Sequence, residues 1–174
     1  MRLIVFILFG LINLNTAFAY DLNKIRKDYY LAVEDSKKSE ELYTYLSSIK
    51  NPDAIILAYL GSAQAIRAKH SWNPYNKVSY LKEGFKKLDA AVKKDPDHLE
   101  VRFLRFTLEH YVPDFLGYSK NLVADKDKII HLLTNKDTGS LSGQKAILQN
   151  MINFLIESKE CSAKEIGILQ KLSI

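Results

Sequence analysis

The sequence has little that would support a cross-linked fold or a metal cluster. It contains one Cys, seven Gly and four Pro among 174 residues. One Cys excludes an intramolecular disulfide framework and any multi-Cys zinc or iron–sulfur site. The low Gly and Pro contents exclude collagenous and low-complexity chains, and the 47% hydrophobic content excludes wholesale disorder. The length is that of one domain.

Motifs of the common enzyme classes are also missing. No Gly-x-Ser-x-Gly motif, Walker loop or Gly-rich dinucleotide motif occurs. His70, His98, His110 and His131 form no H-x-x-x-H pair and no H-E-x-x-H motif, so they predict no zinc site. We therefore expect no catalytic residue, no metal and no cofactor, and we interpret Cys161 as a free, mildly buried thiol.

The first nineteen residues have the pattern of a secretory signal. Arg2 precedes the apolar run from Leu3 to Leu14, and Ala17-Phe18-Ala19 is an A-x-A cleavage pattern. The alternative, a retained membrane anchor, needs about 20 apolar residues. We therefore expect cleavage before Tyr20 and no integral membrane segment in the mature chain. Since the sequence has no N-x-[ST] glycosylation motif, a bacterial periplasmic or secreted protein is the simpler interpretation.

The charge balance argues against nucleic acid as a partner. The 25 Lys and Arg residues exceed the 20 Asp and Glu residues by only five. Binding to nucleic acid needs a dense basic face. The lysines between residues 82 and 94 are interleaved with Glu83, Asp89 and Asp95. This segment therefore predicts a solvated face that keeps the mature domain soluble.

The mature chain, residues 20–174, is predicted to be one all-α domain of seven or eight antiparallel helices. Apolar residues recur at helical spacing and no segment alternates cleanly as a strand would. Asn51-Pro52, Asn73-Pro74 and Asp95-Pro96 mark helix boundaries. The expected helices span residues 21–35, 39–49, 52–70, 74–94, 97–111, 119–134, 141–158 and 162–172.

Two of these helices have distinctive compositions. Small residues at Ala58, Gly61 and Ala65 let a neighbour approach the helix over residues 52–70 closely. The helix over residues 97–111 is apolar around most of its circumference, so we expect it to be the most buried one.

One segment has a spaced pattern of small and apolar residues that ends in a proline. Its members are Leu60-Gly61, Gly84, Leu88, Ala91 and Pro96. Over about residues 55–106 the chain thereby resembles the tetratricopeptide-repeat (TPR) family, as one divergent repeat. Gly61 and Pro96 are 35 residues apart, against about 24 in the family, so about eleven extra residues fall around residues 71–80. The following helix has Arg105-Phe106 where the family has a Leu-Gly pair. The resemblance implies a short TPR-like array of stacked hairpins, and scaffolding or binding rather than catalysis.

Aromatic residues mark the connection between the third and fourth helices. Trp72, the only Trp of the chain, lies there close to Tyr75. Rigid aromatic side chains on a connection are good interface anchors, because they offer large contact area with little entropy to lose. The alternative is that both residues plug the end of the hairpin stack, since large aromatic residues are mostly buried.

A polar stripe runs along the otherwise apolar fifth helix. Its members, at helical spacing, are His98, Arg102, Arg105 and Glu109. Because the first helix of each pair lines the groove in the TPR family, the resemblance implies that Arg102 and Arg105 present two guanidinium groups to a partner's carboxylate. The alternative is a solvent-facing stripe with an Arg105–Glu109 pair, worth a few tenths of a kcal/mol.

These features predict an exported, soluble helical-repeat protein that binds another protein or peptide in the cell envelope without catalysis. The predicted contact residues are Trp72, Tyr75, Arg102 and Arg105. The alternative is a small-molecule-binding or enzymatic helical domain with a pocket between helices. That pocket would use His70, Trp72 and Glu109. The identity of the partner and the oligomeric state follow from neither hypothesis.

Overall fold

The computed structural model describes residues 20–172, and the expected signal segment lies outside them. The described chain is all-α, as predicted, with eight α-helices, two short 3-10 helices and no strand. The α-helices are α1 (Leu22–Ala32), α2 (Ser36–Ser48), α3 (Ala54–His70), α4 (Pro74–Lys94), α5 (Leu99–Tyr111), α6 (Leu122–Thr134), α7 (Lys145–Glu157) and α8 (Ala163–Leu169). The 3-10 helices are η1 (Asp114–Leu116) and η2 (Gly139–Leu141). No helix between residues 20 and 172 has both the length and the apolar character needed to cross a membrane.

Side-chain caps set the starts of several helices. Asp21, Asp53 and Asn73 each accept a hydrogen bond from a backbone N–H in the first turn of the helix that follows. Asp35 does the same for α2, so this helix begins at Ser36 rather than at the predicted Ser39. Asp53 likewise makes α3 begin at Ala54 rather than at the predicted Pro52. Capping therefore explains the predicted starts after Asp21 and Asn73 and also both corrections.

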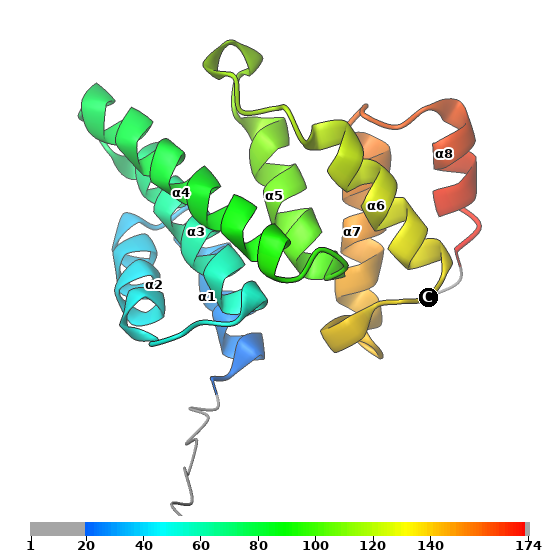
Figure 1. Cartoon of the computed structure of the whole chain (residues 1–174), viewed down its shortest axis with the longest axis horizontal. Coiled ribbons are helices and arrows are strands. Elements are labelled where there is room, and N and C mark those ends of the chain that lie inside the picture. The colour runs from blue at the N-terminus through cyan, green and yellow to red at the C-terminus, as the bar shows by residue number, and fades with distance from the viewer. Residues whose placement is uncertain (1–19, 173–174) are drawn as a thin grey trace, which may run out of the picture.

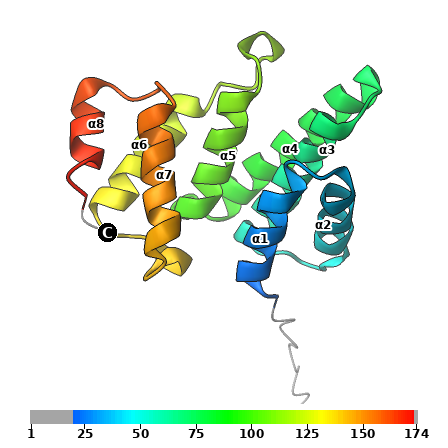
Figure 2. The same cartoon turned by 180° about the vertical axis from the view of Figure 1, so that it is seen from behind.

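The helices run alternately up and down and form neighbouring hairpins (Figure 1). The turns after α1, α3, α5 and α7 lie toward one end of the molecule, and those after α2, α4 and α6 lie toward the other, as the reverse view agrees (Figure 2). The α3–α4 hairpin projects beyond its neighbours, since these helices have 17 and 21 residues. The extra residues expected around 71–80 belong mostly to α4, and only residues 71–73 connect the two helices.

The hydrophobic core has two parts that meet at α5. The first part lies among α1 to α5, and the second among α5 to α8. Helix α5 contributes Val101 and Leu104 to the first part, and Leu99 and Phe106 to the second. The prediction that α5 is the most buried helix is wrong, because 13 of the 17 residues of α3 are buried against 7 of 13 in α5. Helix α3 is packed by α1, α2, α4 and α5.

The close approach expected along α3 is confirmed at two glycines. A Cβ atom on Gly61 would lie 2.8 Å from the carbonyl oxygen of Gly84, and a Cβ on Gly84 would lie 2.7 Å from that of Gly61. The backbones of α3 and α4 therefore touch at this crossing. The hairpin is held together by backbone contact in the middle, and its tip extends beyond the core.

Candidate functional site

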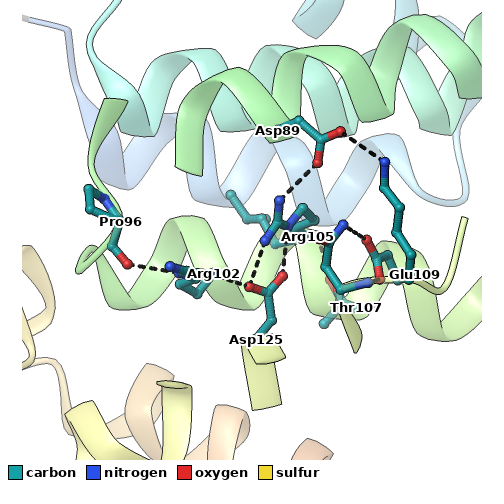
Figure 3. Close-up of polar contacts among 10 residues, drawn as sticks. Asp89, Pro96, Arg102, Arg105, Thr107, Glu109 and Asp125 are labelled. Carbon is teal, nitrogen blue, oxygen red and sulfur yellow. Dashed lines mark hydrogen bonds and ion pairs between the residues drawn. The ribbon is translucent and has the colours of Figure 1, made fainter. Parts of the chain in front are cut away.

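The two arginines of the polar stripe of α5 belong to a buried ion network that joins three helices (Figure 3). Arg105 donates to Asp125 of α6 through two nitrogens, with Nε to Oδ2 at 2.7 Å and Nη2 to Oδ1 at 2.8 Å. Its Nη1 atom donates to Oδ1 of Asp89 on α4 at 2.8 Å. Arg105 is 6% exposed and Asp125 is fully buried. All three nitrogens of the Arg105 guanidinium group are thus engaged within the molecule.

Arg102 joins the same network. Its Nη1 atom donates to Oδ1 of Asp125 at 2.7 Å, and its Nε atom donates to the carbonyl oxygen of Pro96 at 2.8 Å. The side chain of Arg102 is 15% exposed. Neither arrangement considered from the sequence is the observed one, because Arg102 and Arg105 face α6 rather than an open groove or bulk solvent. Their arrangement is that of residues that join helices.

The other two members of the stripe also have structural partners. Nδ1 of His98 accepts from the backbone N–H of Val101 and caps α5. Glu109 accepts from the backbone N–H of Asn121 at 2.8 Å and from its side-chain amide at 2.7 Å. These bonds attach the start of α6 to the end of α5.

Burial affects the pKa of two charged residues of the α5 stripe, Glu109 and Arg105. Burial raises the pKa of Glu109, and the hydrogen bonds from Asn121 oppose that rise only in part. Burial alone would lower the pKa of Arg105, but its hydrogen bonds to Asp125 and Asp89 outweigh burial and raise it. The guanidinium group therefore stays charged within the network.

Sequence reasoning missed the centre of this network, Asp125. A signal for it was present, because Asp125 lies on the same helical stripe as Leu122 and Ile129, which are both apolar. A carboxylate on an apolar stripe must find a cation when the stripe is buried. Which cation it meets depends on how α5 and α6 are packed.

The two predicted aromatic contact residues lie at the tip of the α3–α4 hairpin. Trp72 is 99% exposed in the connection, and Tyr75 is 85% exposed in the first turn of α4. The interpretation that they plug the end of the stack is therefore wrong. Within the tip, Asn73 caps the start of α4. His70 attaches the tip to the end of α1, because its Nε2 atom bonds to the carbonyl oxygen of Ala32 at 2.9 Å.

Most exposed large hydrophobic residues of the described chain lie toward the same end as this tip. Nine such residues are exposed, and eight of them belong to the turns after α1, α3 and α5 or to the helix turns beside them (Figure 1). These eight are Tyr30, Leu31, Trp72, Tyr75, Val78, Tyr111, Phe115 and Val123. We call them the aromatic end. The ninth, Tyr45, lies in the last turn of α2, toward the opposite end.

The three residues suggested for a pocket do not line one hollow together. His70 borders a hollow between α2, α3 and α4, whose lining includes neither Trp72 nor Glu109. Among residues 20–172, no three His, Cys, Asp or Glu side chains gather in a way that could hold a metal ion. Cys161 is a free, partly buried thiol, and burial raises its pKa.

Comparisons of the chain with protein-family models, with curated proteins and with solved structures find no significant match. The function of this chain must therefore be inferred from its fold and from the placement of its side chains.

Proposed function

We propose that this protein is a helical binding module that holds another protein or peptide in the cell envelope, with the aromatic end as its contact surface. The proposal includes export through the signal pattern of residues 1–19 and a short TPR-like stack of hairpins. The observation that carries it is the near-complete exposure of Trp72 and Tyr75 on a fixed helical tip.

Exposed aromatic residues of this kind favour a contact role on energetic grounds. A Trp and a Tyr that stay in water forgo about 1.5–3 kcal/mol each that burial of a large apolar side chain provides. Trp72 and Tyr75 add nothing to the core, although they lie on either side of Asn73, the residue that caps the start of α4. Aromatic side chains held in this way lose little entropy when a partner covers them.

The contact surface that we propose does not include Arg102 or Arg105. Their nitrogens donate to Asp125, Asp89 and the carbonyl oxygen of Pro96. A partner's carboxylate would have to displace these internal acceptors. The guanidinium groups therefore contribute to the packing of α5 on α6, and the aromatic end supplies the contact.

The experiment places a photo-crosslinking amino acid at position 72 of the chain that begins at Tyr20, in native envelope extract. The matched control has the same amino acid at position 45, an exposed aromatic position at the opposite end. We expect a specific protein adduct from position 72 only. The captured protein is then purified, and its affinity is measured against the parent chain and a Trp72→Ser, Tyr75→Ser variant.

The affinity measurement decides the proposal. A loss of about tenfold or more in the double variant, with Tyr45→Ser unchanged, is the expected result, since aromatic anchors cost about 2 kcal/mol or more when truncated. Equal affinities for the parent and the double variant would contradict it. Adducts with phospholipid in place of protein at position 72 would also contradict it and would identify a membrane surface as the partner.

A further inference from the structure

A small polar hollow lies between α2, α3 and α4, close to the tip of the hairpin. Its volume is about 170 Å³, and its lining consists of Ser36, Ser39, Glu40, Arg67, His70, Ser71 and Tyr80. Pockets that hold a whole drug-sized ligand measure about 300–1,000 Å³. The hollow is therefore suited to a single polar group of a ligand rather than to a complete cofactor.

Arg67 is the cation of this lining, and its orientation is fixed. Its guanidinium carbon lies 4.1 Å from the centre of the Tyr43 ring and 4.5 Å from that of the Tyr80 ring. Its Nε atom donates to Oε2 of Glu40 at 2.8 Å. Two cation–π contacts and one charge-assisted hydrogen bond thus hold the plane of the group before any ligand arrives.

The outer edge of the same guanidinium group has no internal acceptor. Within residues 20–172, neither Nη1 nor Nη2 of Arg67 makes a hydrogen bond, although its side chain is only 19% exposed. In Arg105, by contrast, both corresponding atoms are bonded to carboxylates. Arg67 therefore keeps donors that match the two oxygens of a carboxylate or phosphate.

A second lining residue also has an unused hydrogen-bonding group. Ser39 is fully buried, and its hydroxyl oxygen has no hydrogen-bond partner among the described residues. Buried hydroxyl groups are normally bonded, because an unpaired one has lost its hydrogen bonds to water without gaining others. An oxygen atom bound in the hollow would offer this hydroxyl an acceptor after rotation of its side chain.

We propose that the hollow is a binding site for an oxyanion group, a carboxylate or a phosphate, which pairs with the Nη1 and Nη2 edge of Arg67. Glu40 remains on Nε in the bound state, so the ligand adds to the present arrangement without displacing an ion pair. The rings of Tyr43 and Tyr80 restrict the guanidinium group and reduce the entropy that binding costs.

The site has a consequence for the partner, and this consequence rests on the proposed function. Ser71 of the lining is next to Trp72 in the chain. A peptide or protein that covers the tip would bring an acidic side chain or its terminal carboxylate to the hollow. Binding of a small anion tests the hollow alone, so its outcome is separate from that of the crosslinking experiment.

The test is an NMR titration of the chain from Tyr20 with inorganic phosphate, with acetate and, at matched ionic strength, with chloride. In the parent chain the Arg67 Nε–Hε signal reports the site. The backbone amide signals of Ser39 and Ser71, two residues of the lining, report it in the parent chain and in every variant. Arg67→Gln removes the guanidinium group with its Nη1 and Nη2 donors. Lys93→Gln is the matched control, because it also removes one positive charge, but from the far end of α4. Arg67→Lys keeps the positive charge but lacks the paired Nη1 and Nη2 donors. Far-UV circular dichroism verifies that each variant is folded.

We expect saturable shifts of the Arg67 signal with phosphate or acetate, and none with chloride. Affinity falls about tenfold or more in Arg67→Gln and Arg67→Lys and is unchanged in Lys93→Gln. Equal responses to phosphate, acetate and chloride in the parent chain would overturn the proposal, even if a variant failed to fold. Saturation by phosphate but not by acetate would assign phosphate as the ligand group, and the reverse would assign carboxylate.

Vesicles distinguish a lipid phosphate from a free one. The parent chain is mixed with phosphatidylglycerol vesicles and with phosphatidylcholine vesicles. Sedimentation with phosphatidylglycerol that Arg67→Gln abolishes would assign a lipid headgroup as the source of the phosphate. The absence of sedimentation, together with saturation by inorganic phosphate or acetate, supports a soluble ligand or a peptide acid.

Discussion

The tip of the α3–α4 hairpin and the junction of α4, α5 and α6 use their conspicuous residues in opposite ways. At the junction, Arg105 and Asp125 are buried and pair with each other. At the tip, Trp72 and Tyr75 are exposed and contribute no packing. At these two places charged residues are buried and aromatic residues are exposed, which is the reverse of the usual distribution. The difference separates residues that pair with each other inside the fold from residues whose side chains face solvent.

Arg105 and Arg67 differ in a similar way, in how many of their guanidinium nitrogens are bonded within the chain. Arg105 uses Nε, Nη1 and Nη2 on carboxylates of its own chain, whereas Arg67 uses only Nε in this way. Both guanidinium groups are held in place. Of the two, only Arg67 has both Nη atoms unbonded to any carboxylate of the described chain, so the number of internal acceptors, rather than charge, separates these two arginines.

Removal of Asp125 is the strongest way to break the junction. Asp125→Ala leaves Arg102 and Arg105 without their shared buried carboxylate, and we expect a loss of about 3–5 kcal/mol in unfolding free energy. Urea unfolding followed by circular dichroism measures it. The control is Asp89→Asn, whose carboxylate is 42% exposed and for which we expect a much smaller loss. Equal losses for both would show that the buried network is not what holds the junction.

Gly84→Ala tests the backbone contact in the middle of the α3–α4 hairpin. The new Cβ atom would meet the carbonyl oxygen of Gly61 at 2.7 Å, so α3 and α4 must separate. We expect a loss of about 1–3 kcal/mol, the usual cost of overpacking, measured by urea unfolding. Gly167→Ala in α8 is the control, because nothing lies within 4 Å of its added Cβ. There we expect a gain of up to about 1 kcal/mol from helix propensity. A gain at both positions would contradict the close contact.

Glu165 provides a smaller, pH-dependent contribution on the α6–α8 side of the molecule. Its pKa is lowered from 4.5 to about 2, first by the hydrogen bond from Lys126 and then by those from Ser162. A carboxyl group with a lowered folded-state pKa stabilises the fold above its unfolded pKa, and this contribution is lost as the pH falls from about 4.5 toward about 2.

We therefore expect Glu165→Gln to lower the melting temperature at neutral pH and to flatten its decline between pH 4.5 and pH 2. Thermal melts across this pH range measure both effects. Glu157→Gln, at an exposed position of α7 without an ion pair among the described residues, serves as the control. A parallel acid decline in the parent and in Glu165→Gln would show that the Lys126 contact carries no pH dependence.

The smallest expected effect on stability is at the tip. Trp72→Ser combined with Tyr75→Ser removes two side chains that are 99% and 85% exposed, so the unfolding free energy should change by no more than about 0.5 kcal/mol. Urea unfolding measures this change. A loss of several kcal/mol would mean that the aromatic residues pack in solution, and the contrast between tip and junction would fail.

Much of the fold could be predicted from the sequence because its helix signals are local. Asp21 and Asn73 cap helices where the sequence indicated, whereas α3 begins two residues after the predicted Pro52 because Asp53 caps it. The small residues of α3 correctly predicted a close neighbour. The prediction that α5 is the most buried helix failed, because apolar residues around the circumference of a helix do not show how many helices pack against it. Helix α3 is packed by four helices, and that number is a property of the assembled fold.

The candidate site was predictable only in part. Trp72 and Tyr75 were identified as contact candidates from their residue types and their place between two helices, and their exposure keeps them candidates. The stripe of Arg102 and Arg105 was identified as one face of a helix, but Asp125 is 20 or more residues away in sequence. Local spacing cannot anticipate a partner that another helix supplies.

The sequence by itself determined the helical class, the helix boundaries near Asn–Pro and Asp–Pro pairs, and the residues with unusual chemistry. These properties depend on local spacing, caps and side-chain type. Only the tertiary structure decided which of these residues are engaged internally. Arg105 meets two carboxylates, whereas the outer edge of Arg67 meets none among the described residues, because hydrogen-bond satisfaction depends on which helices come together in space.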